Sequence, residues 1–487
     1  MKQFLLISAI LPFCSFCLQA QCTSLSFEDA LQMLNNKNKD VKIAEQGIES
    51  ARKQRDIMNA TWYPMVGATG MYVHTSNDIA VKEPLSGITN PIKDVVHEFL
   101  PNDQIISGLL DKLGAQTLSL TLLPQNMSTI DATLAWPIFT GGKRYFASKI
   151  GRSLINAAEI NKQQTISEVQ TLLVERYFGL RLQKSIQDIR EETLKSLEHH
   201  YKNAVALEQN GMINRAELLV AQVSKDEAKR ELSASNKDVA VTLEALKACI
   251  YMEETEDITT TTPLFINQEI PSLEYFQNLM QANNYIIQGL NVKQQMAKQA
   301  IKIEEAGYLP NIALMGKQTL YAHQVPKNLL PRTMIGVGFT WNIFDGLARE
   351  KKIRQAKINS YTLDLGKDKA KTDLNVGVEK LYTELQKAID NVNALKSSLE
   401  LTVELVRIRE KAFQEGMATS TEVVDAEVML SKIKVAYMLA FYEYDVALMN
   451  LLSICGAPQE FHDFKAKGIT ETALISSITN NDKNINN

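Results

Sequence analysis

Histidines, paired carboxylates and cysteines most often carry catalysis or bind metals, so their spacing is the first test for chemistry. No two of the six histidines have the H-x-x-x-H spacing of a helical metal site. His199 and His200 are adjacent, so on a helix they point in different directions, and we expect a solvent-exposed face there. The sequence also has no Walker loop, dinucleotide fingerprint, nucleophile elbow or paired-cysteine motif. These absences predict a protein that is not an enzyme and uses no metal and no cofactor.

Glu422 and Asp425 are the carboxylates whose spacing is most suggestive. Three residues apart, they lie on one face of a helix. They come shortly after Gly416, near the start of a helical run, where the positive end of the helix dipole favours acids in any protein. From the residues alone, ordinary helix-start acids are the simpler interpretation.

Two similar segments organise the elements around these acids. Each is an alternating apolar run that breaks at glycine and opens into a long charged helical pattern, which predicts strand, turn and helix. The copies are Trp136–Gly142 and Trp341–Leu347, 205 residues apart (341 − 136). The shift of 205 superimposes two of the three tryptophans in the chain, so chance is a poor explanation for the similarity of the two segments. The turns are expected at Trp136, Gly141, Gly142, Trp341, Asp345 and Gly346.

The doubling extends along most of the chain, as in proteins with internal repeats. Downstream, the same shift superimposes Asn210-Gly211-Met212 on Glu415-Gly416-Met417 and Glu217 on Glu422. Upstream, Tyr63-Pro64 falls on Leu309-Pro310 at a shift of 246 (309 − 63). The first copy therefore holds 41 extra residues (246 − 205), within 75–127. We expect an external loop or cap there, with a helical run of apolar residues at Ile105, Ile106, Leu109, Leu110 and Leu113.

Each repeat is predicted to contain a helix, a strand, a loop, a second strand and a helical hairpin. The first helix spans 26–60, and the strands span 65–74, 128–139, 311–323 and 332–344, with the weak alternation typical of membrane strands. The stretch 143–210 would form a helix on the order of 100 Å long. Apolar residues from Leu374 to Leu399 step by four and three, which predicts a coiled-coil seam. Gly211 and Gly416 then end the long helices.

The domain organisation follows from these repeats. Residues 1–20 have the charged start, apolar stretch and small-residue cleavage site of a signal peptide. The first repeat spans 21–262, including the long loop at 75–127, and the second spans 263–457. Residues 458–487 end in a polar stretch that we expect to be disordered. Whether Cys22 is lipidated stays open.

Composition narrows the class of protein. The net charge of −4 gives no electrostatic reason to expect nucleic acid as a partner. After the leader, no stretch approaches the ~20 apolar residues of a transmembrane helix. The exported chain is then either soluble outside the cytoplasm or crosses a membrane as β-strands. Four strands cannot close on themselves, because the smallest known membrane barrels have about eight. Three copies would supply twelve.

With these residues in view, the chain resembles the TolC-like outer-membrane efflux family over roughly 24–457. The resemblance rests on the tandem repeat, on Tyr308-Leu309-Pro310, on Trp341-Asn342-Ile343-Phe344-Asp345-Gly346 and on Gly416-x5-Glu422-Val423-Val424-Asp425-Ala426. It implies a mainly α fold with a small β part. Two tandem repeats of long coiled-coil helices and two strand pairs would build a homotrimer. Its twelve-stranded transmembrane β-barrel would continue as a periplasmic α-helical barrel.

The resemblance also implies a function and partners. The chain would be the outer-membrane channel of a tripartite efflux system in a Gram-negative bacterium, a passive conduit for small molecules or exported substrates. The hairpin tips at Gly211, Met212, Gly416 and Met417 would contact a periplasmic adaptor, which links to an inner-membrane pump. Glu422 and Asp425 match acids at the closed periplasmic entrance, where three copies would form rings that favour cations. Where some members have a basic residue after the tip glycine, this chain has Ala418-Thr419-Ser420.

Two other classes of function remain open from the sequence. A periplasmic coiled-coil scaffold or adaptor would have the same helices but would not span the membrane. An enzyme with the 75–127 insertion as a lid lacks any acid–base pair to support it.

Overall fold

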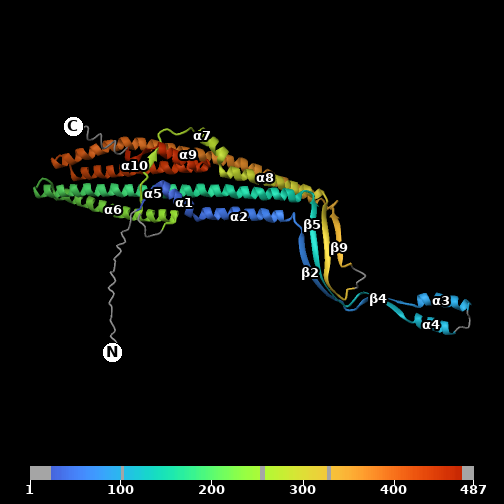
Figure 1. Cartoon of the computed structure of the whole chain (residues 1–487). Coiled ribbons are helices and arrows are strands. Elements are labelled where there is room, and N and C mark those ends of the chain that lie inside the picture. Colours follow the sequence, from blue (N-terminus) through green and yellow to red (C-terminus); the bar gives the residue numbers. More distant parts are fainter. Residues whose placement is uncertain (1–22, 100–103, 253–257, 326–330, 474–487) are drawn as a thin grey trace, which may run out of the picture. The chain divides into compact units, whose positions relative to one another are not determined.

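The computed structural model describes residues 23–99, 104–252, 258–325 and 331–473 (Figure 1). The expected signal peptide, Cys22 and the last part of the tail lie outside these residues. Contacts divide the chain into two compact units. One comprises the described parts of Met1–Ser50, Asn156–Lys293 and Leu363–Asn487, and the other comprises Ala51–Ile155 and Gln294–Thr362. Each unit therefore draws on both repeats rather than on one.

The start of each repeat is a helix pair joined by an asparagine. The pairs are α1 (Phe27–Lys37) with α2 (Lys39–Ala60), and α7 (Leu273–Asn283) with α8 (Tyr285–Glu305). The expected single helix over 26–60 is thus broken at Asn38, which has ψ 128° and whose side chain accepts a bond from Val41 N. Asn284, 246 residues later, does the same with Ile287 N. An asparagine side chain that caps a new helix favours this break over a continuous helix.

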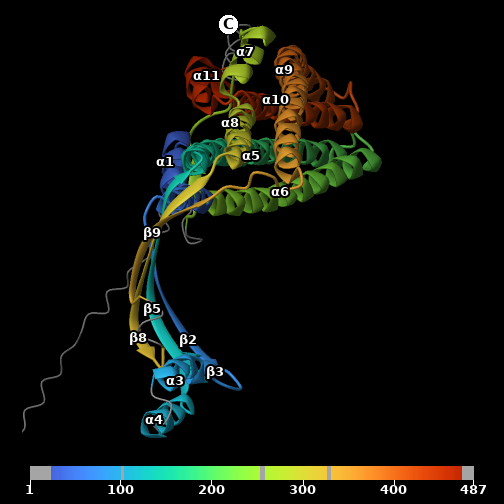
Figure 2. The same ribbon diagram turned by 90° about the vertical axis from the view of Figure 1, so that its right-hand side faces the viewer.

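The hairpins of the two repeats have matching lengths. Helices α5 (Lys143–Gln209) and α9 (Ala348–Gln414) each have 67 residues. They are followed by α6 (Arg215–Ile250) and α10 (Ser420–Ile454), which lie beside them (Figures 1 and 2). The predicted seam of α9 is confirmed, because Leu374, Val378, Leu385, Ala388, Val392 and Leu399 are buried. Apolar burial along such a seam, rather than helix propensity, stabilises helices of this kind.

An aromatic cluster in the first unit packs the C-terminal segment. Phe461 is 2% exposed and its ring contacts those of Phe27, Phe178 and Phe265. The segment comprises η2 (Pro458–Glu460), α11 (Phe461–Lys467) and β10 (Ile469–Thr470), which pairs antiparallel with β7 (Phe265–Ile266). The expectation of a polar, disordered tail from 458 is therefore wrong for residues 458–473, because it overlooked this aromatic anchor. A second small pair, β1 (Thr23–Leu25) with β6 (Ile258–Thr260), is parallel.

The second unit contains a four-stranded antiparallel sheet. Its order is β2–β5–β8–β9, with β2 (Met65–His74), β5 (Asn126–Thr140), β8 (Asn311–His323) and β9 (Thr333–Thr340). The short helix η1 (Ala306–Tyr308) precedes β8. All four predicted strands are present, although β9 ends at Thr340 and leaves residues 341–344 outside it. Strands β2 and β9 are the edges of this sheet.

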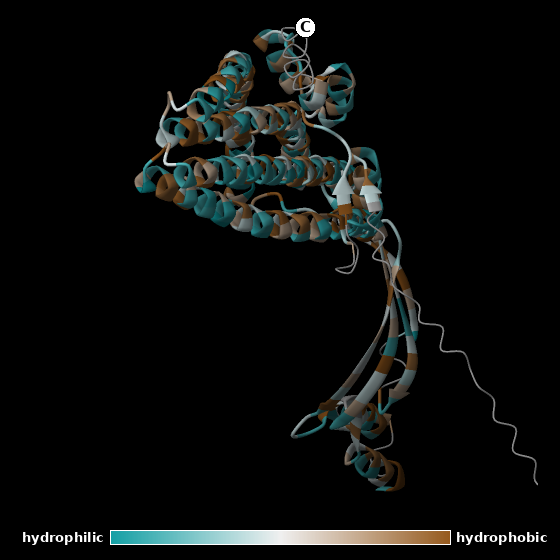
Figure 3. Cartoon of the chain, turned by 90° about the vertical axis from the view of Figure 1, so that its left-hand side faces the viewer, coloured by the Kyte–Doolittle hydropathy of each residue, from teal (hydrophilic) through white to brown (hydrophobic). Residues whose placement is uncertain are grey.

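One face of the sheet is apolar and exposed. Paired residues of antiparallel strands share a face, and Val66 pairs with Leu134, while Val337 pairs with Leu314. Val66 and Val337 are 76% and 66% exposed. The opposite face carries charged and hydroxyl groups among exposed methionines, since Asp131 accepts bonds from Lys317 and Thr319 there. Apolar segments appear as brown bands along the strands in Figure 3.

The connection between β2 and β5 contains more regular structure than the helical run expected from Ile105 to Leu113. It comprises β3 (Ile79–Pro84), α3 (Ser86–Phe99), α4 (Gln104–Gly114) and β4 (Thr117–Leu123). Strands β3 and β4 pair antiparallel. Across the described residues, none of the helices is both long and apolar enough to cross a membrane.

Candidate functional site

The hairpin tips are glycine turns between long helices. Gly211 and Gly416 have φ of 73° and 74°, the left-handed region that glycine adopts without a steric cost. No atom lies within 4 Å of a Cβ built on either residue, so the backbone angle and not crowding requires glycine. Met212 and Met417 follow at the tips and are 58% and 72% exposed. The predicted tip residues therefore lie on exposed turns.

Each turn is followed by a side-chain cap. Asn214 accepts a bond from Glu217 N at the start of α6, and Thr419 accepts one from Glu422 N at the start of α10. The second cap is a full capping box, because the Glu422 carboxylate also accepts a 2.9 Å bond from Thr419 N. Such reciprocal bonds satisfy two N–H groups that have no partner within the helix.

The two predicted acids have different surroundings. Glu422 is half-exposed, and Arg409 Nη1 of α9 lies 2.9 Å from its Oε1. The hydrogen bond from the Thr419 backbone, with Arg409 nearby, lowers the pKa of Glu422. Asp425 lies three residues further on and is exposed. Among the described residues, no hydrogen bond or ion pair is recorded for the Asp425 side chain. Glu422 thus has a structural role as well, whereas the carboxylate of Asp425 is exposed.

A hydrogen-bonded cluster joins the two hairpins near their tips. The Glu217 carboxylate accepts a 2.6 Å bond from Ser420 N, and the Ser420 hydroxyl lies 2.6 Å from His200 Nε2. His200 is 3% exposed, and its ring packs against that of Phe413. The expectation of a solvated face at 199–200 is wrong for His200, because this aromatic contact and Ser420 bury it. Burial lowers the pKa of His200 to about 4.

This cluster was not predicted from the sequence, although comparison of the two repeats shows a difference at these positions. The 205 shift places Glu217 on Glu422, but it places Ala204 where Arg409 stands. Glu422 therefore has an arginine from its own hairpin, and Glu217 instead bonds to the other hairpin. Asymmetric positions in an otherwise matching repeat are the signal that points to these residues.

The two strand-to-helix turns share one hydrogen-bonding pattern. Trp136 Nε1 donates to the carbonyl of Trp62 at 3.0 Å, and Trp341 Nε1 donates to the carbonyl of Tyr308 at 3.1 Å. The first bond ties Trp136 to the chain just after α2, and the second ties Trp341 to the end of η1. Asp345 accepts a 3.1 Å bond from Arg349 N and so caps the start of α9. The predicted turn tryptophans and Asp345 therefore make specific structural contacts.

The glycines of these turns have positive φ. Gly141, Gly142 and Gly346 have φ of 63°, 89° and 70°. Leu347, which the repeat aligns with Gly142, has φ of 66°. A leucine in the left-handed region costs about 1–2 kcal/mol. A Cβ on Gly141 would also lie 2.5 Å from Ala306 O, so this position requires glycine for two reasons.

Two arginines that sequence reasoning overlooked complete these turns. Arg144 Cζ lies 4.3 Å from the Trp62 ring centroid, and its guanidinium donates to the carbonyls of Thr61 and Ile138. Arg349 repeats the arrangement 4.0 Å over the Tyr308 ring. Cation–π and carbonyl contacts at one guanidinium anchor helix, turn and strand together. The equal 205 spacing of Arg144 and Arg349 would have identified them.

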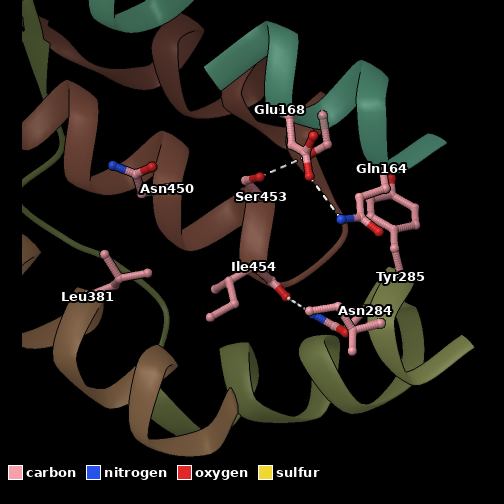
Figure 4. Close-up of a pocket in the computed structure, with 10 residues that line it drawn as sticks. Gln164, Glu168, Asn284, Tyr285, Leu381, Asn450, Ser453 and Ile454 are labelled. Atoms are coloured by element: carbon pink, nitrogen blue, oxygen red, sulfur yellow. Dashed lines mark hydrogen bonds between the residues drawn. The ribbon is translucent and has the colours of Figure 1, made fainter. Parts of the chain in front are cut away.

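A pocket of about 310 Å³ in the first unit is lined by polar side chains that bond to one another and to the backbone (Figure 4). Asn284 Nδ2 donates to the carbonyl of Ile454, and Gln164 donates to Glu168. Ser453 lies at hydrogen-bond distance from Ser167. The bonds of Asn284 and Ser453 join different helices, whereas the Gln164–Glu168 bond lies within α5. The lining contains no nucleophile with an adjacent base. In the described part of the chain, no cluster of histidine, cysteine and acidic side chains is placed to hold a metal.

Comparison with known proteins gives a consistent result. A family model described as "Outer membrane efflux protein" matches residues 30–250 and 277–457. No curated protein sequence matches the chain.

Solved structures of outer-membrane channels have a similar fold. A structure of CusC superposes with a TM-score of 0.70 at 15% identity, covering 88% of this chain and 92% of that one. VceC of Vibrio cholerae gives 0.66 at 14%, covering 88% and 96%. The open state of MtrE of Neisseria gonorrhoeae gives 0.66 at 15%, covering 89% of each. At these identities the likeness shows the fold.

Proposed function

This chain belongs to the outer membrane efflux protein family, and from that premise we propose that three copies assemble into a passive channel for efflux. The chain is placed in the outer membrane, with its helices extending into the periplasm. Small molecules or exported substrates would pass through the channel. A partner pump would supply the energy.

The observation that carries this proposal is the open sheet of the second unit. One face is apolar and exposed, whereas the other carries Asp131, Lys317 and Thr319. Such a sheet suits lipid on one side and water on the other. Its edge strands β2 and β9 have unpaired backbone groups along one side. In lipid each unpaired group costs several kcal/mol, so the edges need partners.

Copies of the same chain supply those partners most simply. If β9 of one copy pairs with β2 of the next, three copies close a sheet of twelve strands (3 × 4). The backbone groups of both edges would then be paired, and the faces that carry Asp131 and Lys317 would line a water-filled space. The long helices α5, α6, α9 and α10 of the three copies would continue that space into the periplasm.

The entrance of this channel is proposed at the start of α10. Glu422 and Asp425 of three copies would form two acidic rings, which favour cations and disfavour anions. Asp425 is the better candidate for facing the channel, because its carboxylate is exposed. Glu422, held by Thr419 and Arg409, would contribute charge at a fixed position.

The exposed hairpin tips are proposed as the contact with a periplasmic adaptor. Met212 and Met417 offer flexible apolar side chains, which suit an interface that adapts to its partner. Gly211 and Gly416 keep the turns tight. An inner-membrane pump would be connected through that adaptor.

The entrance is tested by neutralising its charge while keeping its shape. The double variant Glu422→Gln with Asp425→Asn should lower the cation selectivity of the channel in a planar bilayer. Asp390→Asn, an exposed residue of α9 far along the sequence from the tip, serves as the matched control. Unchanged selectivity in the double variant would remove the acidic entrance but leave the family and the fold as they are.

A further inference from the structure

The helical hairpin α3–α4 is a preformed element in the connection between β2 and β5. Lys93 of α3 pairs with Asp111 of α4 at 2.7 Å. Thr89 packs so closely against Gly114 that a Cβ on the glycine would lie 2.5 Å from Thr89 Oγ1. These contacts fix which faces of the two helices meet and which face outward.

The outward face of the hairpin is apolar. Ile88, Ile92, Val95 and Phe99 of α3 are 63%, 48%, 54% and 77% exposed. Leu109 and Leu113 of α4 are 59% and 41% exposed. Isolated apolar side chains on a surface are ordinary, but a continuous stripe of them marks a binding surface. We call these six residues the hairpin stripe.

The spacing of the stripe indicates that its partner is another helix. Ile88, Ile92, Val95 and Phe99 step by four, three and four residues. That is the spacing of a coiled-coil seam, which is narrower than the apolar face of a helix that lies in lipid. The charge of the hairpin is consistent with this partner, because α3 and α4 together contain two lysines and three acidic residues. Such a surface gains little from anionic lipid and barely repels a copy of itself.

The hairpin is also placed where copies would meet. It connects β5 to β2, and β2 is an edge strand whose proposed partner is β9 of the next copy. In the closed sheet, three hairpins would therefore leave the same rim of strands. Each would stand beside the junction with its neighbour.

We propose that the hairpin stripes of three copies pack against one another and cap the outer mouth of the channel. This inference rests on the proposed trimer, since a single chain has only one hairpin. Helix packing through α3 would bury the stripe and hold the cap closed. Separation of the hairpins would then be needed for substrate to leave.

The test uses photo-crosslinking from the stripe in the full-length protein in outer membranes. A benzoylphenylalanine at position 95, replacing Val95, should give products that join residues 86–114 of two copies. The same probe at exposed Asn90, about 200° around α3 from Ile88 at ~100° per residue, is the matched control. It should give no such product.

Light scattering of the same samples separates the two proposals. A trimer with products from position 95 and none from 90 supports the cap. A trimer with no product from 95, equal products from both positions, or products only with lipid or another protein overturns the cap and leaves the channel proposal standing. A monomer overturns both.

A second variant tests what the cap does. Ile92→Ser with Val95→Ser should keep the trimeric mass, abolish the crosslink from a probe at Phe99 and raise the channel's conductance. The same mass with unchanged conductance would show that the stripe does not close the mouth.

Discussion

The carboxylate of Glu217 accepts a 2.6 Å hydrogen bond from the backbone N–H of Ser420. Glu217 lies in the first turn of α6, and Ser420 is the first residue of α10. The N–H groups of a first helical turn have no acceptor within their own helix. Glu217 therefore supplies an acceptor from the other hairpin and joins the two tips.

Removal of this acceptor should loosen the tips. Glu217→Ala leaves Ser420 N–H without its charged acceptor, a type of bond that contributes about 1.5–3 kcal/mol. We expect a higher conductance across planar bilayers than for the unaltered protein. Glu198→Ala, at an exposed position of α5, should leave conductance unchanged. Equal currents from both variants would show that the bond does not hold the entrance.

The pKa of His200 predicts a loss of stability in acid. Burial lowers this pKa to about 4 from an ordinary value of 6.5. Between those values the unfolded chain binds a proton that the folded chain excludes, so the free energy of unfolding falls as pH drops through this window. Above pH 6.5 His200 does not reduce the free energy of unfolding. Below that pH the reduction reaches about 3 kcal/mol.

Hydrogen exchange at the hairpin tips between pH 7 and 4 measures this effect, after correction for the intrinsic pH dependence of exchange. His200→Gln should flatten the profile, because glutamine does not titrate. His97→Gln, at an exposed position of α3, should keep the unaltered slope. A slope that persists in His200→Gln would assign the acid sensitivity to another group.

Much of the fold was predictable because each element of one repeat is supported by the matching element of the other. The tip glycines and the four strands follow from local sequence patterns, and they were found near the expected positions, although β9 ends four residues early. Long-range contacts were not predictable in the same way. His200 is buried by Ser420 and Phe413, which lie more than 200 residues away along the chain.

The C-terminal segment illustrates the same limit. Residues 458–473 look polar, but one aromatic residue, Phe461, inserts among Phe27, Phe178 and Phe265 from three other elements. Within the 75–127 insertion, the apolar run predicted α4, but α3 and the β3–β4 pair were not predicted, for a different reason. The insertion occurs in only one repeat, so self-comparison of the sequence says nothing about its structure.

Two glycines with the same backbone conformation should respond differently to alanine. Gly141→Ala adds a Cβ that would lie 2.5 Å from Ala306 O, whereas Gly346→Ala meets nothing within 4 Å. Both variants incur the left-handed cost of about 1–2 kcal/mol. Only Gly141→Ala should also force the backbone to shift. Thermal unfolding in detergent should show the larger loss for Gly141→Ala, and equal losses would contradict the close approach of Ala306.

The two side-chain caps at the tips should make similar contributions. Asn214→Ala and Thr419→Ala each remove the side-chain acceptor for an N–H in the first helical turn. Each should destabilise the start of its helix by about 1 kcal/mol. Hydrogen exchange of the first-turn amides of α6 and α10 measures both. Unchanged protection at Glu422 N in Thr419→Ala would contradict the capping box.

Four strands per chain should form a closed sheet only when copies assemble. The most direct test is the mass of the detergent-extracted protein by light scattering, corrected for bound detergent. We expect about three chains per particle, because three copies supply the twelve strands of the proposed closed sheet. A stable monomer under gentle extraction would contradict it, because the edges of β2 and β9 would then stand unpaired in lipid.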